Sequence, residues 1–184
     1  LKIHHAPLLI EEIGRVGFLK FLNTTIYDIT ETILLRKGVI YEYVENEIVI
    51  SWKLKDGIKN FNCLNTFFEI SDKLKTKESV YVEKYKSAPY FTASLHFDKI
   101  TIGEIGEMKS EIKYHGDAMN TASRILGITS SENTFLVSQK LLNLFESVPP
   151  FQTHDCGEFF LKGKVNPVRL FCIEKQPQPE LHEI

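Results

Sequence analysis

The feature that most limits the fold of this chain is a strand-rich segment, residues 38–52, between two long stretches of helical periodicity. This segment is dense in β-branched and aromatic side chains, and a polar break at residues 45–47 divides it, which is typical of a β-hairpin. Apolar residues recur at helical spacing before it, over residues 9–34, and after it, over residues 58–85. Helix, hairpin and helix in this order predict an α+β fold, with helices packed on a mostly antiparallel sheet.

The second half of the chain continues the alternation in shorter pieces. We expect strands over residues 91–105 (with a turn near Asp98) and 108–114, a helix over 116–126, a strand over 135–137, a helix over 139–145, and a closing hairpin of residues 153–161 and 168–173.

No internal repeat and no Gly-, Pro- or Ser-rich linker divides the sequence. Residues 1–174 are therefore predicted to form one domain, and residues 175–184 a mobile tail. Leu1 to Ile3 have the pattern of the end of a strand whose beginning is absent, so we expect the chain to be a piece of a longer protein.

Composition argues against two classes of partner. Lys and Arg number 22 against 24 Asp and Glu, for a net charge of −2, so we expect no nucleic acid and no anionic membrane as partner. No apolar run approaches the roughly 20 residues of a membrane helix, so no membrane contact is expected within this chain. Three cysteines without CxxC spacing favour free thiols and a cytoplasmic location, either alone or as the soluble domain of a longer membrane or sensor protein.

Four segments resemble a single family. Residues 116–124, Gly-Asp-Ala-Met-Asn-Thr-Ala-Ser-Arg, are similar to the GDxxNxAxR helix of class III adenylate/guanylate cyclases, and residues 95–117, LHFDKITIGEIGEMKSEIKYHGD, to the strand pair that leads into that helix. Residues 38–52, GVIYEYVENEIVISW, resemble the metal-binding hairpin of the family, and residues 161–164, Leu-Lys-Gly-Lys, its closing loop.

This resemblance covers residues 1–173 and implies a ferredoxin-like cyclase fold. It implies a reaction that converts a purine nucleoside triphosphate into a 3′,5′-cyclic nucleotide and pyrophosphate, with two metal ions to polarise the attacking and leaving oxygens. It also implies a head-to-tail homodimer or a heterodimer with a second cyclase domain, because one chain of the family site supplies metal carboxylates and the other supplies transition-state residues.

Asn120 and Arg124 are the catalytic candidates. They are four residues apart and lie on one face of the predicted helix. The resemblance makes Asn120 the residue that orients the ribose and Arg124 the residue that stabilises the α-phosphate, a task that suits a guanidinium. It makes Lys164 the triphosphate-binding lysine, although a lysine at a hairpin turn is also commonly just solvated; Lys162 is a weaker substitute.

The two family metal positions hold no carboxylate. They are occupied by Lys2 and Asn46, and a charged lysine repels a divalent cation while a neutral amide is a poor ligand for one. We therefore expect no metal cofactor for this chain alone, and Mg²⁺ or Mn²⁺ only if a partner supplies the aspartates. Two less favoured alternatives are a displaced metal on Glu45 or Glu47, and a histidine cluster of His4, His5 and His115.

Two glycine positions of the family are also changed. Glu45 and Asp98 stand where the family has glycine, so reshaped turns are expected at both positions.

Base recognition is left open. Glu42 and Lys113 occupy the positions that in adenylyl cyclases often hold Lys and Asp, so the charges are exchanged. Glu42 either accepts hydrogen bonds from a guanine, or pairs with Lys113, or both side chains face solvent.

Three functions follow from these residues. The favoured one is a complementing or regulatory cyclase subunit in cyclic-nucleotide signalling, inactive alone, which keeps the transition-state half-site and lacks the metal half-site. The others are an active homodimeric cyclase with unusual metal binding, and a non-catalytic nucleotide-binding or dimerisation module.

Overall fold

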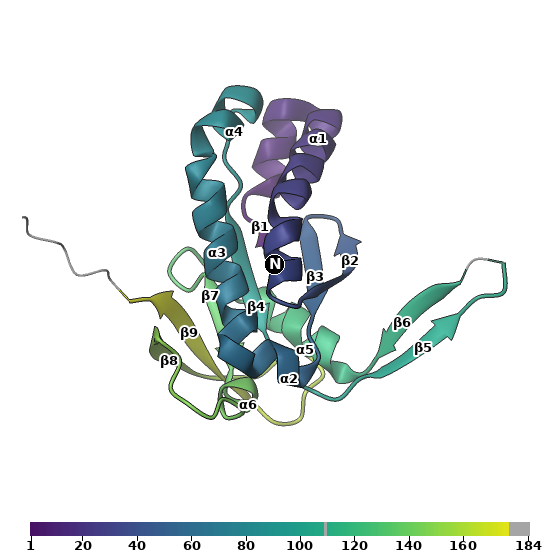
Figure 1. Ribbon diagram of the computed structural model, residues 1–184, viewed down its shortest axis with the longest axis vertical. Helices are drawn as coiled ribbons and strands as arrows, with labels where there is room; N and C mark the ends of the chain where they lie inside the picture. Colours follow the sequence, from purple (N-terminus) through teal and green to yellow (C-terminus); the bar gives the residue numbers. More distant parts are fainter. Residues whose placement is uncertain (109, 177–184) are drawn as a thin grey trace, which may run out of the picture. The chain divides into compact units, whose positions relative to one another are not determined.

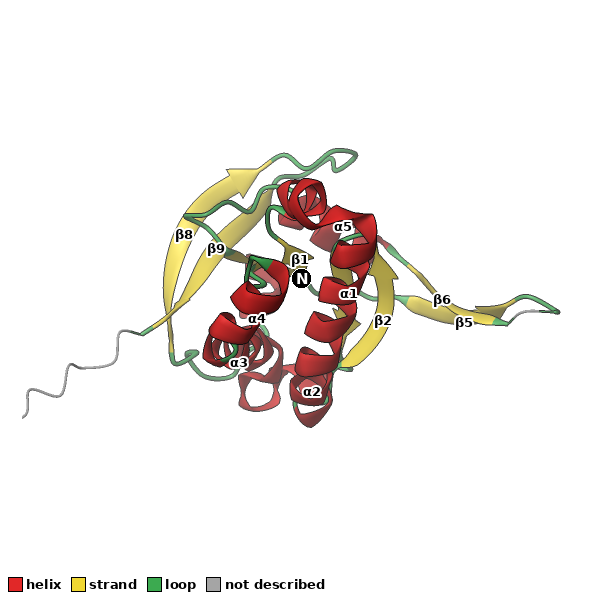
Figure 2. Cartoon of the chain, turned by 90° about the horizontal axis from the view of Figure 1, so that it is seen from above, coloured by secondary structure: helices red, strands yellow, loops and turns green. Residues whose placement is uncertain are grey.

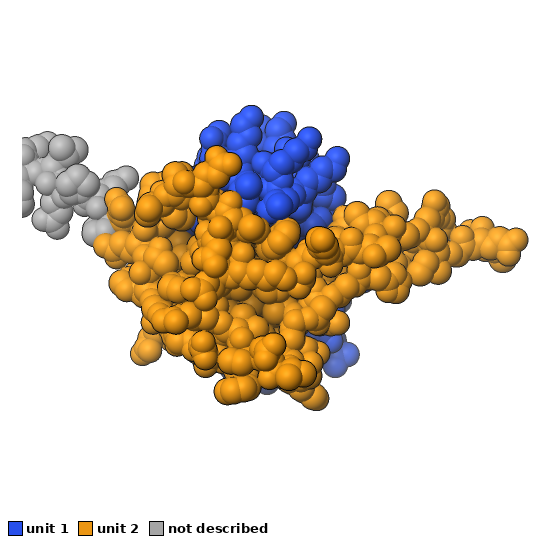
Figure 3. All heavy atoms as spheres, turned by 90° about the horizontal axis from the view of Figure 1, so that it is seen from below, with its two compact units in different colours: residues 1–93 blue, residues 94–184 orange. Residues whose placement is uncertain are grey.

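The computed structural model describes residues 1–108 and 110–176. These residues form two compact units, residues 1–93 and the described residues from 94 onward (Figure 3). The division between Ala93 and Ser94 falls inside one strand. The predicted α+β class is confirmed, since each unit combines antiparallel strands with helices. The single domain expected over residues 1–174 stays a prediction.

Unit 1 combines a sheet in the order β2-β3-β1-β4 with a layer of helices (Figure 1). Its elements are β1 (Lys2–Ile3), α1 (Ala6–Leu35), β2 (Val39–Val44), β3 (Glu47–Ser51), α2 (Leu54–Ile58), a 3₁₀ turn (Lys59–Phe61), α3 (Asn62–Thr76), α4 (Glu78–Tyr85) and β4 (Phe91–Leu95), the strand that crosses the division.

The helix expected over residues 9–34 is confirmed as α1, which is interrupted at Gly14 (φ 73°, ψ 164°). The predicted helix over residues 58–85 is instead divided at Lys77, whose φ of −103° and ψ of 5° are not helical. The ammonium of Lys77 lies 2.5 Å from the carboxylate of Asp28 in α1, a contact between residues distant in sequence.

The core of unit 1 lies where α1 packs against α3 and α4 (Figure 2). Phe21 and Ile29 of α1 and Leu64 of α3 are fully buried, and the Phe21 ring meets the Tyr81 ring edge-on. Burial of such side chains is the main favourable term in folding, about 1.5–3 kcal/mol for each side chain. The Tyr81 hydroxyl also donates a 2.9 Å hydrogen bond to the buried carboxylate of Asp28.

Among the described residues of unit 2, strands β7, β9 and β8 pair antiparallel in this order. Strands β5 and β6 form a separate two-stranded sheet. A compact apolar cluster joins α5, β7 and β9: Ile125, Leu136, Leu161, Leu170 and Cys172. The elements are β5 (Thr101–Ile105), β6 (Glu111–His115), α5 (Asp117–Leu126), β7 (Phe135–Ser138), α6 (Gln139–Leu142), β8 (Phe151–Phe159) and β9 (Val168–Lys175).

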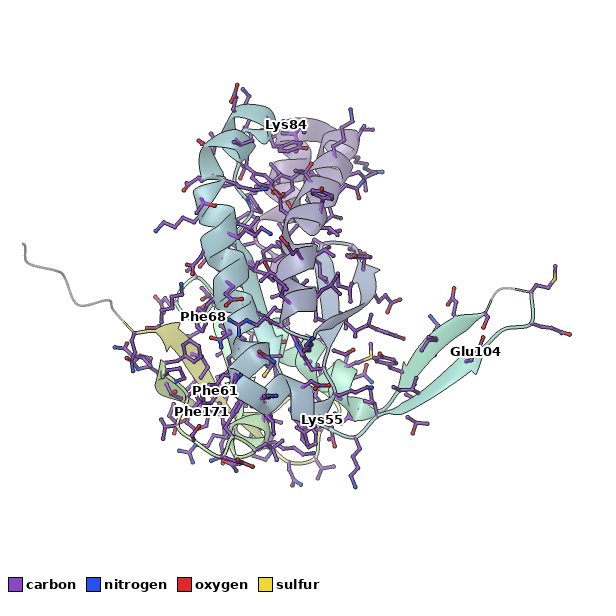
Figure 4. The ribbon with its side chains drawn as sticks, viewed as in Figure 1. Lys55, Phe61, Phe68, Lys84, Glu104 and Phe171 are labelled. Carbon is purple, nitrogen blue, oxygen red and sulfur yellow. The ribbon has the colours of Figure 1, made fainter. Side chains whose placement is uncertain are left out.

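The β5–β6 hairpin extends from the start of α5 as a ribbon (Figure 1). Large apolar side chains on it are exposed to solvent, and charged ones such as Glu104 lie between them (Figure 4). The exposed apolar residues of this hairpin are Ile102, Ile105, Met108 and Ile112.

Most predicted elements are confirmed, including the hairpin over residues 38–52 and the helix that follows Gly116. The helix expected over 139–145 is shorter and ends at Leu142. Strand β9 continues to Lys175, so the expected tail begins one residue later, and its residues 177–184 lie outside the described part of the chain. Among the described residues, no helix combines the length and the apolar character needed to cross a bilayer.

Candidate functional site

The start of α5 is fixed by backbone geometry and by packing. Gly116 has φ +152°, and a Cβ at this position would lie 2.9 Å from the carbonyl oxygen of Lys99, so only glycine fits. The Ser94 hydroxyl donates a 2.7 Å hydrogen bond to the carbonyl of Ala122, and Ile125 is fully buried. These contacts hold one face of α5 against the rest of unit 2, so the residues on its other face have fixed positions.

Asn120 and Arg124 lie one turn apart on α5, Asn120 exposed and Arg124 half-buried. The guanidinium of Arg124 lies against Gly163: a Cβ there would be 3.4 Å from Nη2 and 3.6 Å from Nη1. Because Gly163 has φ +73° and no side chain, the loop before β9 approaches the guanidinium closely. The structure therefore brings two sequence-predicted segments together, the motif helix and the Leu-Lys-Gly-Lys loop.

Lys164 also reaches α5. Its ammonium forms an ion pair with the carboxylate of Asp117, and its backbone amide donates a 3.0 Å hydrogen bond to the carbonyl of Leu161. Leu161 is buried in the unit 2 core and anchors the loop. Unit 2 thus collects two cationic groups, Arg124 and Lys164, and one anion, Asp117, on α5 and on the loop before β9.

Asp117 is a site residue that sequence reasoning missed. Its carboxylate lies at the first turn of α5, where a negative charge interacts favourably with the helix dipole. In the sequence, this stabilising role is sufficient to explain an aspartate at the start of a helix. The signal that was available is its place beside Gly116 in the motif. Its partner is 47 residues away, and nothing in the local pattern indicates that contact.

A second missed group is formed by His96 and Asp98, which follow β4, together with Ser138 of β7 and Lys140 of α6. The Nδ1 atom of His96 is 2.8 Å from the hydroxyl oxygen of Ser138, and its Nε2 atom is buried without a hydrogen-bond partner among the described residues. Asp98 lies 4.0 Å from that Nε2 atom and 2.8 Å from the ammonium of Lys140.

Burial is the largest influence on the imidazole of His96. It lowers the pKa of His96 to about 4, with Lys140 and Lys164 acting in the same direction and Asp98 acting against them. The hydrogen bond from Lys140 and the backbone amide of Lys99 hold the pKa of Asp98 below its usual value.

Lys2 and Asn46, the two residues that the sequence resemblance matches to metal positions, lie in unit 1 and have internal partners. The ammonium of Lys2 lies 3.3 Å from the carboxylate of Glu47, and the side-chain nitrogen of Asn46 donates a 2.9 Å hydrogen bond to the carbonyl of Ile3. The place where β1 meets the β2–β3 turn, called here the edge of unit 1, presents the ammonium of Lys2 and the amide nitrogen of Asn46. These groups do not fit a divalent cation.

The two expected turn changes have different outcomes. Glu45 adopts the left-handed conformation that glycine favours, with φ 53°, so the hairpin turn keeps its geometry at the cost of strain. Asp98 is not among the described residues with positive φ, which agrees with a reshaped turn there.

The remaining candidates are distributed over both units. Glu42 is half-buried on β2 of unit 1, opposite Val49. The ammonium of Lys113 on β6 of unit 2 lies 2.9 Å from the carboxylate of Glu111. His4 and His5 have ring centroids 3.8 Å apart, and the described residues contain no group of three or more His, Cys, Asp or Glu side chains placed to hold a metal.

Comparisons with known proteins identify the fold. The chain is 27% identical over 157 residues to Adenylate cyclase 2 of Rhizobium meliloti (strain 1021), a match that covers 85% of this chain and 43% of that protein. Among solved structures, the adenylyl cyclase CyaB from P. aeruginosa gives a TM-score of 0.79 at 18% identity, covering 96% of this chain and 92% of that one. This chain has the class III nucleotidyl cyclase fold.

Guanylyl cyclases share the cyclase fold at slightly lower TM-scores. The guanylyl cyclase Cya2 gives a TM-score of 0.75 at 16% identity, covering 98% of this chain and 91% of that one. The guanylate cyclase domain of RhGC from Catenaria anguillulae, in complex with GTP, gives 0.73 at 14% identity, covering 96% and 93%. No protein-family model matches the chain. The resemblance inferred from the sequence is confirmed, and the cyclase fold by itself does not select a base.

Proposed function

We propose that this cyclase-fold chain supplies the transition-state half of a composite nucleotidyl cyclase site and depends on a second cyclase domain for the metal half. The reaction of such a site converts a purine nucleoside triphosphate into a 3′,5′-cyclic nucleotide and pyrophosphate. The chain is inactive alone and acts as a complementing or regulatory subunit in cyclic-nucleotide signalling.

One observation carries this proposal. The guanidinium of Arg124 lies directly against Gly163, so the loop that carries Lys164 and the helix that carries Asn120 meet within unit 2. A triphosphate needs cationic donors for its developing negative charge and a polar group for its ribose. The three side chains are of these types and lie on adjoining segments of one compact unit.

Each residue has a role under the proposal. The amide of Asn120, exposed on α5, orients the ribose so that its 3′-oxygen is in line with the α-phosphorus. The guanidinium of Arg124 donates hydrogen bonds to the α-phosphate as charge develops there. The ammonium of Lys164 binds the outer phosphates, for which it must leave the carboxylate of Asp117.

The proposal assigns divalent-cation binding to the partner. The edge of unit 1 presents the ammonium of Lys2 and the amide of Asn46, which are not ligands for Mg²⁺ or Mn²⁺. The partner's carboxylates would hold the cations that polarise the reacting oxygens.

The exposed apolar side chains of the β5–β6 hairpin support assembly with a second chain. Ile102, Ile105 and Ile112 are each more than half exposed on a ribbon of only two strands, which is unfavourable in an isolated protein. The partner is a second cyclase domain. A heterodimer with a domain that supplies the metal carboxylates is active, whereas a homodimer of this chain is inactive. Three free cysteines support a cytoplasmic location as part of the same proposal.

The proposal is tested by complementation. The purified chain is mixed with a cyclase domain that bears both metal aspartates but has lost its own Asn and Arg, and cyclic nucleotide is measured with Mn²⁺ or Mg²⁺. We expect the mixture to be active and each component to be inactive alone. Arg124→Ala in this chain should reduce the activity of the mixture by at least about a hundredfold, as loss of a transition-state donor does.

Arg169→Ala is the matched control. Arg169 is an exposed arginine on β9, paired with Asp155 on β8, and lies outside the proposed site, so its loss should leave activity unchanged. A mixture that makes no cyclic nucleotide contradicts complementation. Turnover by this chain alone, abolished by Arg124→Ala, would instead establish an active homodimer.

A further inference from the structure

The edge of unit 1 formed by β1 and the β2–β3 turn is closed by three contacts among four residues. The backbone amide of Ile3 donates a 2.9 Å hydrogen bond to the carbonyl of Asn46, and the carbonyl of Ile3 accepts a 2.9 Å hydrogen bond from the Asn46 side chain. Lys2 lies opposite Glu47 in the β1–β3 pairing, with their charged groups 3.3 Å apart. Both backbone groups of Ile3 are therefore satisfied by one residue of the turn.

The hydrogen bond from Asn46 could not be made by an aspartate. A carboxylate oxygen in place of the Asn46 nitrogen would face the carbonyl oxygen of Ile3 at the same 2.9 Å, with no proton between two acceptors. Such a pair is stable only with a positive group between the oxygens. Asparagine supplies that positive group as an N–H.

Lys2 contributes a positive charge beside Asn46. Its side chain is 39% exposed and that of its partner Glu47 is 25% exposed, so the pair is partly buried, and the ammonium of Lys2 neutralises the carboxylate of Glu47. With an aspartate in place of Lys2, two carboxylates would face each other across β1 and β3. Repulsion between them would favour binding of a cation.

From these contacts we infer that Lys2 and Asn46 are a built-in substitute for divalent cations: an ammonium and an amide hydrogen hold β1 to the β2–β3 turn, which makes this edge insensitive to divalent metal. The inference rests on the proposed function, because it takes these positions to be the metal half of a cyclase site. The substitution changes which ions the edge accepts and leaves the backbone pairing of β1 intact.

The left-handed turn residue supports this inference. Glu45 keeps the positive φ of a turn glycine, so the turn still presents residue 46 toward β1. The edge thus retains the backbone geometry with different polar groups. Restoring the two carboxylates should restore a requirement for a cation.

The test measures thermal stability and does not use activity. The wild-type chain and the double variant Lys2→Asp with Asn46→Asp are melted in EDTA and in saturating Mn²⁺. We expect no shift for wild type, and for the double variant a low Tm in EDTA that rises by about 5–10 °C with Mn²⁺, the shift expected when a site is filled about a hundredfold above its Kd.

A charge-matched control carries Lys20→Asp and Asn23→Asp on an exposed part of α1 and should show no comparable shift. The inference is overturned if Mn²⁺ raises the Tm of wild type by the same amount, or if the double variant folds and does not respond to Mn²⁺. Folding of the double variant only in the presence of Mn²⁺ would support it.

A second measurement needs no variant to fold. The electron paramagnetic resonance signal of Mn²⁺ should remain that of the free ion in the presence of the wild-type chain, and a bound-ion signal removed by adding Mg²⁺ would overturn the inference. Failure of complementation would leave these cation results unaffected, since complementation depends on Asn120, Arg124 and Lys164 in unit 2, so the two proposals fail separately.

Discussion

The ammonium of Lys164 pairs with the carboxylate of Asp117, which joins the loop before β9 to the first turn of α5. The group proposed to bind triphosphate is therefore held by an internal anion in the absence of nucleotide. Both side chains are partly exposed, Lys164 at 21% and Asp117 at 49%, so the pair is accessible to a competing anion. Under the proposed function, binding of a nucleotide by Lys164 and this contact exclude each other.

Replacing Lys164 should lower the affinity for nucleotide, and replacing Asp117 should raise it. Lys164→Ala removes a charged contact to phosphate and should weaken binding of a non-hydrolysable triphosphate analogue about tenfold. Asp117→Asn releases the ammonium and should strengthen binding by up to about fivefold, because an exposed pair is worth at most about 1 kcal/mol. Isothermal titration calorimetry measures both effects, and weaker binding by Asp117→Asn would contradict the competition.

Gly163→Ala should disturb the site through Arg124. The new Cβ would lie 3.4 Å from Nη2 of Arg124, at a backbone φ of +73° that costs a non-glycine residue about 1 kcal/mol. We expect reduced activity in the complementation assay. Gly157→Ala on β8 is the control, since Gly157 also has a positive φ (+87°) but its Cβ would have no neighbour within 4 Å, and equal loss of activity in both variants would argue against a role for the contact.

Stability should fall with acidification partly through His96. Its pKa is lowered to about 4 in the folded chain from an unfolded value of 6.5, so between these values the unfolded chain binds more protons and stability decreases as pH falls. This single group should cost about 2 kcal/mol at pH 5 relative to pH 7.5.

His96→Asn tests this dependence. An asparagine keeps a polar atom near the position of Nδ1, beside Ser138, and does not titrate. Urea unfolding at several pH values should show a smaller loss of stability below pH 6.5 in this variant. Identical pH profiles for the two chains would show that His96 does not contribute.

Asp28 should be important for the helix layer of unit 1. Its carboxylate is 7% exposed and accepts hydrogen bonds from Lys77 at 2.5 Å and Tyr81 at 2.9 Å. Asp28→Ala leaves the buried hydroxyl of Tyr81 without this acceptor and should cost about 2–3 kcal/mol in urea unfolding. Glu31→Ala on the same helix removes only an exposed pair with Lys73, and its cost should stay below about 1 kcal/mol.

The sequence predicted those elements whose signals are local. The hairpin over residues 38–52 follows from its β-branched run and polar turn, and α5 follows from the glycine before it and its periodicity. The division between α3 and α4 at Lys77 was not predicted, since its contact with Asp28 joins residues distant in sequence. Periodicity alone does not reveal such tertiary contacts.

The contacts within the candidate site could not be predicted from the sequence either. Asn120, Arg124 and Lys164 were found from motifs, but the contact of Arg124 with Gly163 and the pairing of Lys164 with Asp117 depend on how the loop folds back on the helix. The His96–Ser138 contact was likewise not predicted, because it joins residues 42 positions apart through packing. The roles of the motif residues stay predictions.

The β5–β6 ribbon has a consequence for how assembly can be observed. Two strands alone are only marginally stable in water, so the amide protons along this ribbon should exchange rapidly with deuterated solvent while the chain is unassembled. Covering its isoleucines with another chain would slow that exchange. Deuterium uptake by this one peptide stretch would then report the onset of association at concentrations too low for scattering methods.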